Sequence, residues 1–168
     1  MSEKNALLDA LIVQVEDQLT ALVRRQQDTA DGATHEESRS EHAKDTRATE
    51  QSYLARGLAE RVEQSRRTVA ALHHLELQTF EISDPIAISA LVTLETESEE
   101  GAAKTERWFV VPGAGGLELE LEATESAPIR TVTPVSPLGR SLLGLVAGDE
   151  GEVRTPRGRR AFEVVDVA

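Results

Sequence analysis

The feature that most constrains the fold is a long stretch without proline, in which apolar side chains recur at heptad spacing. No proline occurs before Pro85. The first series of apolar positions, separated in turn by four, three, four and three residues, consists of Leu8, Ile12, Val15, Leu19 and Leu22. This spacing is typical of a helix that buries one narrow stripe against another helix.

A second series with the same spacing follows at Leu58, Val62, Ser65, Val69 and Leu72. Each seam is too narrow to build a globular core alone, so we expect the two to bury each other in an antiparallel coiled-coil hairpin. We expect the turn near Glu41 and His42, which gives arms of about 45 Å or longer at the usual helical rise. Asp31-Gly32 is a candidate break, where the first helix would stop and then restart.

The predicted turn is rich in carboxylates. Glu37, Glu41 and Asp45 are spaced i, i+4 and i+8, so they would share one face of a helix, or converge at the tip if they straddle the turn. Carboxylate oxygens suit Mg²⁺, which normally takes only one or two of them and keeps its waters. The alternative is that they are ordinary solvated side chains of an exposed loop. We expect the chain to bind no metal by itself here.

Arginines recur along both arms, among them Arg47, Arg56 and Arg61. Two interpretations stay open. These cations could form ion pairs within a helix, with carboxylates such as Glu60 and Glu63. They could instead form a basic side of the rod that faces RNA or the acidic wall of a channel.

Ser83-Asp84-Pro85 ends the helical part, because a residue before proline avoids the α conformation. We therefore expect two domains, residues 1–82 and 83–168. Alternating and β-branched segments predict strands at Ile86–Leu94, Arg107–Val111, Leu117–Ala123, Ile129–Val135, Gly151–Thr155 and Arg160–Val167. The fold class is α+β: a helical hairpin, then a small β-sheet domain that packs one short helix.

The short helix is expected directly after the fourth strand. Ser136 is a natural N-cap, and Pro137 suits the first helical turn because its missing N–H would be unsatisfied there. Gly144 is placed to stop the helix. This half contains no histidine, so nucleophilic catalysis has no evident base.

Composition excludes several classes of protein. The net charge of −12 makes autonomous binding of free nucleic acid improbable on electrostatic grounds, although nucleic acid could be reached inside a more basic partner. The absence of cysteine excludes disulfides and thiolate metal sites and fits a reducing cytoplasm. Asp9, Glu16 and Asp17 interrupt the N-terminal apolar positions, so we expect neither a signal peptide nor a membrane span.

Residues 136–167, SPLGRSLLGLVAGDEGEVRTPRGRRAFEVVDV, resemble the C-terminal half of the Gre family (GreA/GreB) of bacterial transcript-cleavage factors. The resemblance includes the Ser-Pro-Leu helix start, the Gly148-Asp149 turn and the hairpin at Thr155-Pro156. The N-terminal half is similar in architecture, and SYLARGLAERV, residues 52–62, lies where that family begins its second helix.

The resemblance implies an FKBP-like C-terminal domain without isomerase activity, which binds the rim of the RNA polymerase secondary channel. The coiled coil would enter the channel, where two tip carboxylates help hold the second Mg²⁺ of the polymerase active site. The polymerase would then hydrolyse backtracked RNA near its 3′ end by two-metal chemistry. The chain would be no enzyme itself. It would act as a cytoplasmic monomer that shares Mg²⁺ with the polymerase and meets nascent RNA inside the complex.

The predicted polymerase-binding residues, carried over from the family's docking segment, are Ser136, Pro137, Leu138 and Gly139. The tip departs from the family pattern Asp-Leu-x-Glu-Asn-Ala-Glu-Tyr, so Glu37 with Glu41 or Asp45 is chosen by nearness to the expected turn. Two alternatives remain. One is a channel-binding regulator that does not stimulate cleavage. The other is an FKBP-like isomerase or chaperone, for which the domain offers few aromatic side chains.

Overall fold

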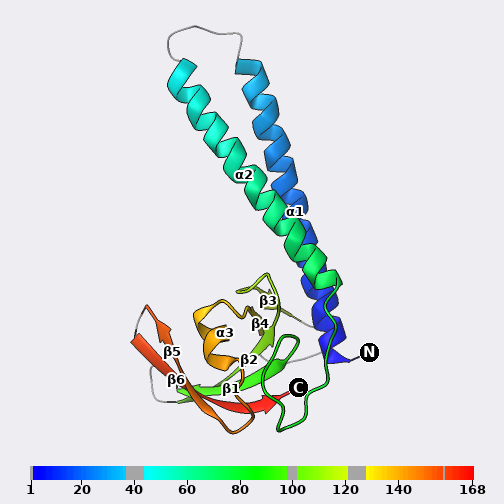
Figure 1. Ribbon diagram of the computed structural model, residues 1–168, viewed down its shortest axis with the longest axis vertical. Helices are drawn as coiled ribbons and strands as arrows, with labels where there is room; N and C mark the ends of the chain where they lie inside the picture. The colour runs from blue at the N-terminus through cyan, green and yellow to red at the C-terminus, as the bar shows by residue number, and fades with distance from the viewer. Residues whose placement is uncertain (1, 37–43, 98–101, 121–127, 157) are drawn as a thin grey trace. The chain divides into compact units, whose positions relative to one another are not determined.

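The computed structural model describes residues 2–36, 44–97, 102–120, 128–156 and 158–168, with the backbone alone for 30–36, 44–49 and 51 (Figure 1). The chain forms two compact units, Ile12–Ala70 and Met1–Leu11 together with Ala71–Ala168. This division falls inside the two long helices, whereas the sequence placed a domain boundary after residue 82. The boundary between residues 82 and 83 stays a prediction.

The helical unit contains most of α1 (Glu3–Glu36) and α2 (Lys44–His73), which run in opposite directions (Figure 1). Val15 and Val62 are the buried members of the two predicted seams in this unit, with 4% and 2% of their surface exposed. The remaining predicted seam positions of this unit are half-buried, namely Ile12, Leu19, Leu22, Leu58, Ser65 and Val69. The second predicted stripe, which also includes the buried Leu72, is confirmed. The first is confirmed from Val15 onward, whereas at the start of α1 the fully buried residues are Leu7 and Leu11 and the predicted Leu8 is half-buried.

One prediction about the first helix is wrong. α1 continues through Asp31-Gly32 and ends at Glu36, without the expected break. A single glycine costs a helix interior only about 1 kcal/mol relative to alanine, which the neighbouring helical residues can offset. The expected turn at Glu41 and His42 lies outside the described residues.

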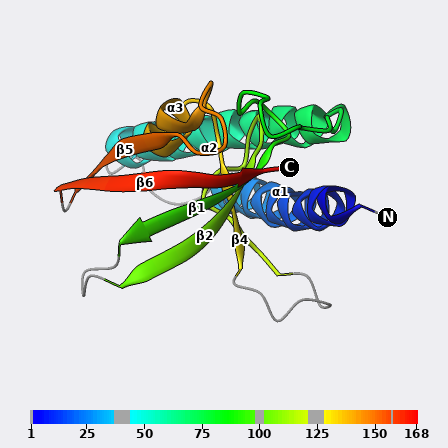
Figure 2. The same cartoon turned by 90° about the horizontal axis from the view of Figure 1, so that it is seen from below.

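The second unit is built on one six-stranded sheet with the strand order β3-β4-β2-β1-β6-β5. Its strands are β1 (Leu91–Glu97), β2 (Ala103–Val110), β3 (Glu118–Leu119), β4 (Ile129–Val132), β5 (Glu150–Thr155) and β6 (Gly158–Val167). β2 and β4 are parallel, and the other neighbouring strands are antiparallel. Figure 2 shows β6 lying between β5 and β1. The fold class predicted from the sequence, a helical pair followed by a sheet domain with one short helix, is confirmed.

Three strands are shorter than predicted. β4 ends at Val132, not Val135, because the chain turns there, with the Ser136 N–H donating to the carbonyl of Thr133. β1 begins at Leu91, not Ile86, because Ser89 has a left-handed φ of 77° that an extended strand does not allow. Ile86 is nevertheless buried, and its backbone N–H donates to Leu145. The expected strand Leu117–Ala123 is reduced to Glu118–Leu119 in the described residues, although Leu119 points inward and Glu118 outward as predicted.

The core of this unit lies between the sheet and α3 (Pro137–Leu142). Its fully or almost fully buried members come from β1, β2, β4, β5, β6, α3 and the segment before β1: Ile86, Ala90, Val92, Leu94, Val110, Val132, Leu142, Val153, Phe162, Val164 and Val167. Most are aliphatic, as the low aromatic content predicts. The short helix is thus held on the sheet by packing, because a helix of this length is not stable alone.

Candidate functional surfaces

The helix α3 has the local structure that its sequence predicts. Ser136 is the N-cap: its Oγ accepts a hydrogen bond from the backbone N–H of Gly139 at 3.0 Å and donates to the carbonyl of Thr133 at 2.9 Å. Pro137 occupies the first helical turn. Gly144 follows the helix with a φ of 86°, a conformation that glycine adopts without a steric penalty. These contacts fix where the chain leaves β4 and enters the helix.

The four predicted polymerase-binding residues differ in how much of their side chains they expose. Gly139 is buried, and a β-carbon placed on it would lie 1.9 Å from the carbonyl oxygen of Thr133. Leu138 is half-buried and packs against the core, and Ser136 is engaged as the N-cap. Only Pro137 is exposed. Three of the four residues therefore shape the segment more than they present side chains to a partner.

Other side chains form the outer surface of this segment, which we call the α3 surface: Val135, Pro137, Arg140 and Leu143. Val135 and Leu143 are among the exposed large apolar residues, at 73% and 38%. By helical periodicity Pro137 and Arg140 lie on the side opposite the buried Gly139 and Leu142. Leu143 is the C-cap, just outside the helix. The sequence reasoning named the segment but missed Val135, Arg140 and Leu143, although the 3.6-residue period would have indicated Arg140.

The predicted tip lies largely outside the described residues. Glu37 and Glu41 are not among them, and Asp45 and Arg47 are described by backbone alone, inside α2. Asp45 is therefore helical and not part of the turn. Among the described residues no three His, Cys, Asp or Glu side chains are grouped so that they could hold a metal ion.

The two remaining predicted basic residues differ. Arg56 pairs with Glu60 one turn away, at 3.3 Å between Nε and Oε1, and both side chains are exposed. This supports the intrahelical interpretation for Arg56, although such exposed pairs contribute little stability. Arg61 is exposed and forms no ion pair with another described residue. It remains the better candidate for contact with an acidic partner.

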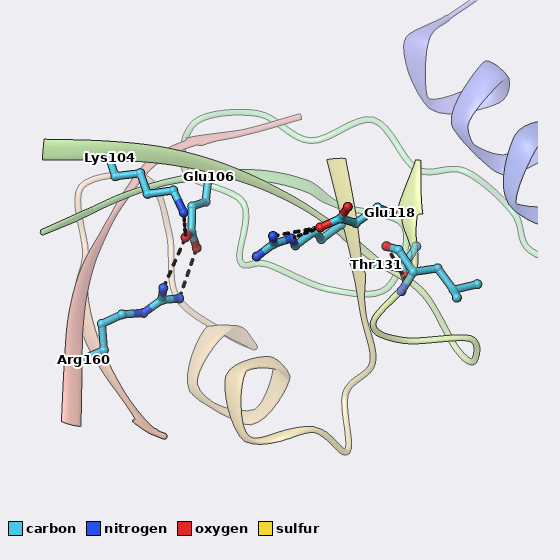
Figure 3. Close-up of polar contacts among 7 residues, drawn as sticks. Lys104, Glu106, Glu118, Thr131 and Arg160 are labelled. Atoms are coloured by element: carbon cyan, nitrogen blue, oxygen red, sulfur yellow. Dashed lines mark hydrogen bonds and ion pairs between the residues drawn. The ribbon is translucent and has the colours of Figure 1, made fainter. Parts of the chain in front are cut away.

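A buried carboxylate on the sheet was not predicted. Glu106 of β2 is only 7% exposed, and Figure 3 shows it between Lys104 of the same strand and Arg160 of β6. Lys104 Nζ lies 3.0 Å from Oε1, and the two terminal nitrogens of Arg160 contact the two carboxylate oxygens at 3.2 and 3.1 Å. Lys104 and Glu106 share one face of a strand by their i, i+2 spacing, a signal that the sequence carried.

The surroundings of Glu106 keep it ionised. Burial acts to raise the pKa of Glu106, but the hydrogen bond from Lys104 and the positive charges of Arg160 and Lys104 outweigh it, so the pKa is lowered from 4.5. The group joins β2 to β6, which are separated in the sheet by β1. Both carboxylate oxygens of Glu106 are already bonded to Lys104 and Arg160, so the group stabilises the packing of these strands.

A second pair of opposite charges lies nearer the other sheet edge. Glu118 of β3 (Figure 3) is contacted by Arg130 of β4 at 2.8 and 2.9 Å. The guanidinium of Arg130 lies 5.9 Å from the centre of the Trp108 ring. Next to it, Thr131 Oγ1 donates to the carbonyl of Ala114 at 2.6 Å and accepts from the N–H of Leu117 at 3.0 Å. These contacts hold the short strand β3 on the sheet.

The first residues of α1 belong to the same unit as the sheet. Arg107 donates from two nitrogens to the two carboxylate oxygens of Glu3, each at 2.8 Å. The hydrogen bond from Arg107 lowers the pKa of Glu3 and outweighs the opposing effect of burial. Lys4 contacts the carbonyl of Gln78 and lies over the ring of Phe80. The start of α1 is thus tied to the rest of this unit by an ion pair, a hydrogen bond and a cation–ring contact.

Comparison with known proteins finds similarity in the part of the chain that contains α3. The family model described as "Transcription elongation factor, GreA/GreB, C-term" matches residues 120–168, which include β4, α3, β5 and β6. A curated relative, transcription elongation factor GreA of Cereibacter sphaeroides, is 39% identical over 87 residues, which is 51% of this chain and 49% of that protein. The chain spans about half the length of the curated relatives it matches.

The solved structures that match this chain have low sequence identity and low TM-scores. Gfh1 of Thermus aquaticus is 20% identical, covers 95% of this chain and 94% of its own length, and has a TM-score of 0.37. The elongation factor GreA/GreB of Nitrosomonas europaea is 19% identical, covers 62% of this chain and 78% of its own length, and has a TM-score of 0.35. Among the described residues no helix is long and apolar enough to cross a membrane.

Proposed function

We propose, from the GreA/GreB-family C-terminal domain that this chain carries, that the protein is a transcription elongation factor that binds RNA polymerase and stimulates cleavage of backtracked RNA. The observation that carries the proposal is that the matched residues 120–168 contain the whole of α3 and its outer surface. The sequence similarity and the exposed side chains thus coincide in one segment.

The α3 surface has the properties of a docking site. Val135 and Leu143 expose apolar area beside a proline and a cation, and exposed apolar groups rimmed by polar residues are common where proteins associate. Gly139 and Ser136 hold the segment in a fixed shape, so little conformational freedom would be lost on binding. We assign this surface to the rim of the polymerase secondary channel.

The helical hairpin would reach into the channel. Glu37 with Glu41 or Asp45 would share the second Mg²⁺ of the polymerase active site. Bound by the polymerase and by these carboxylates, that ion would help activate the water that attacks the RNA phosphodiester. Arg61 would face the RNA or the channel wall. The protein would supply ligands and position, and the polymerase would supply the catalysis.

A stalled, backtracked polymerase complex with end-labelled RNA tests the proposal. Addition of the protein with Mg²⁺ should shorten the RNA. The Glu37→Ala/Glu41→Ala double variant should bind polymerase as the parent does but lose the stimulation. A matched control is Asp9→Ala/Asp17→Ala, which removes the same charge from α1 away from the expected tip and should keep full stimulation.

The outcomes are separable. Binding without RNA shortening would overturn the cleavage proposal and identify a regulator that only occupies the channel. Full stimulation by the Glu37→Ala/Glu41→Ala variant would overturn the assignment of the tip carboxylates. Absence of any binding to polymerase would overturn the partner itself.

A further inference from the structure

The sheet divides at one end into two separate hairpins. β1 and β6 pair only as far as Thr96 with Phe162. Beyond that pair, β1 continues to Glu97 beside β2, while β6 continues to Gly158 beside β5. Figure 2 shows β5 and β6 diverging from β1 and β2 toward these ends. A cavity of about 1140 Å³ lies here and is lined by residues of these four strands and of the β5–β6 turn. We call it the fork.

The base of the fork consists of buried side chains. Thr96, Glu106 and Phe162 line it and are 4%, 7% and 3% exposed. Glu106, held by Lys104 and Arg160, connects the two hairpins across the opening. Within the described residues no strand pairs with the inner edge of β6 from Gly158 to Ala161. An unpaired strand edge offers backbone N–H and C=O groups to an extended peptide.

The acidic and basic side chains that line the fork differ in how far they form ion pairs. Among its cations, Lys104 and Arg160 share the one carboxylate of Glu106, which leaves one positive charge, and Arg159 pairs with Glu152 at 3.2 Å. Four exposed glutamates of the lining form no ion pair with another described residue: Glu95, Glu97, Glu150 and Glu163. Glu95 and Glu163 are the strand neighbours of Thr96 and Phe162, so their side chains lie on the sheet face opposite the base. Among the described residues of the lining, the unneutralised charge on that face is negative.

Three of these glutamates form a row across three neighbouring strands. Glu95 of β1 is the register partner of Glu163 of β6, which is also the register partner of Glu150 of β5. Like charges placed directly opposite each other on antiparallel strands are destabilising. We therefore expect the row to lower the stability of the free protein, and a cationic occupant to relieve that cost.

We propose that the fork binds an extended, Lys- or Arg-bearing peptide segment of a partner protein. The segment would run along the free edge of β6, and its cationic side chains would lie against Glu95, Glu163 and Glu150. The free edge of four residues spans about 13 Å, which matches about four residues of an extended chain. The α3 surface takes no part in this site, so the proposal stands independently of the proposed function.

The test uses the full chain, labelled with ¹⁵N, and a capped peptide of about seven residues that alternates Lys with Val. We expect saturable shifts of the amide signals of Thr96, Gly151, Ala161 and Phe162. The same peptide with Glu in place of Lys should produce no shifts. Equal binding of both peptides, or shifts confined to other parts of the chain, would overturn the proposal.

Glu163 lies in the middle of the row and gives the sharpest variants. Glu163→Lys should weaken binding of the Lys peptide about tenfold, because an attraction becomes a repulsion. Glu76→Lys is the matched control: Glu76 is exposed, lies outside the fork, and the change alters the net charge equally. Equal weakening by both variants would show that binding depends on net charge alone.

A stability measurement separates a binding role from a structural one. Glu163→Gln removes the repulsion from both neighbours, so the variant should unfold at a higher temperature than the parent while binding the Lys peptide more weakly. A lower unfolding temperature would show that Glu163 stabilises the sheet, and would overturn the assignment of the row to a ligand.

Discussion

A β-carbon placed on Gly139 would lie 1.9 Å from the backbone carbonyl oxygen of Thr133. The obstacle is backbone, so it cannot move aside as the end of a flexible side chain could. The close approach places the start of α3 directly against the chain that leaves β4. The glycine of the family-like Ser-Pro-Leu-Gly segment is therefore required by packing, whatever its part in docking.

We predict that Gly139→Ala destabilises the protein by about 1–3 kcal/mol, the usual cost of overpacking a tight site. Urea unfolding measures the change. The matched control is Gly57→Ala in α2, where a β-carbon would meet nothing within 4 Å. That substitution should stabilise by about 0.5–1 kcal/mol, because alanine favours a helix interior. Equal changes in the free energy of unfolding for Gly139→Ala and Gly57→Ala would show that a β-carbon at Gly139 does not clash with Thr133.

Glu106→Gln should destabilise the sheet domain. The substitution keeps the shape but removes the charge that Lys104 and Arg160 contact, and the lost charge-assisted hydrogen bonds contribute about 1–3 kcal/mol. Glu118→Gln, which weakens the more exposed pair with Arg130, should change the free energy of unfolding by at most about 1 kcal/mol. A similar loss in both variants would show that burial of Glu106 is unimportant.

The same carboxylate should make stability depend on pH. The pKa of Glu106 in the folded protein lies below its ordinary value of 4.5, so its contribution is fully present above that pH and is lost as the pH falls through the folded pKa. The pKa of Glu3 is lowered as well and adds to the effect. We expect the parent protein to lose unfolding free energy below pH 4.5 more steeply than Glu106→Gln. Parallel curves for the two proteins would exclude this role of Glu106.

Val135→Asp should weaken binding to RNA polymerase without destabilising the chain. Val135 is 73% exposed, so its replacement leaves the core intact while placing a charge on the α3 surface. A pull-down or a fluorescence titration with polymerase measures the loss, which we expect to exceed about tenfold for a central contact. Ile82→Asp, at a comparably exposed apolar residue outside α3, is the control and should bind normally. Unchanged binding by Val135→Asp would exclude the α3 surface as the docking site.

Local patterns in the sequence were sufficient for the elements with regular periodicity. The heptad spacing through Val15 and Val62 predicted both long helices and most of the faces they bury, although Leu7 and Leu11 at the start of α1 were missed. Ser136, Pro137 and Gly144 gave α3, because capping hydrogen bonds and backbone preferences act within a few residues. The alternation of Leu119 with Glu118 likewise gave the inward and outward faces of β3.

The tertiary structure decided what depends on distant residues. The strain at Ser89 ended a strand that local propensity would have extended, and the helical hydrogen bonds of α1 carried it through Gly32. Lys104 and Arg160, the partners of Glu106, lie 56 positions apart in the chain. The Glu95-Glu163-Glu150 row depends on strand register. A sequence determines which side chains share a face within one element. Which charges meet across strands depends on how the whole sheet pairs, and that is a property of the folded chain.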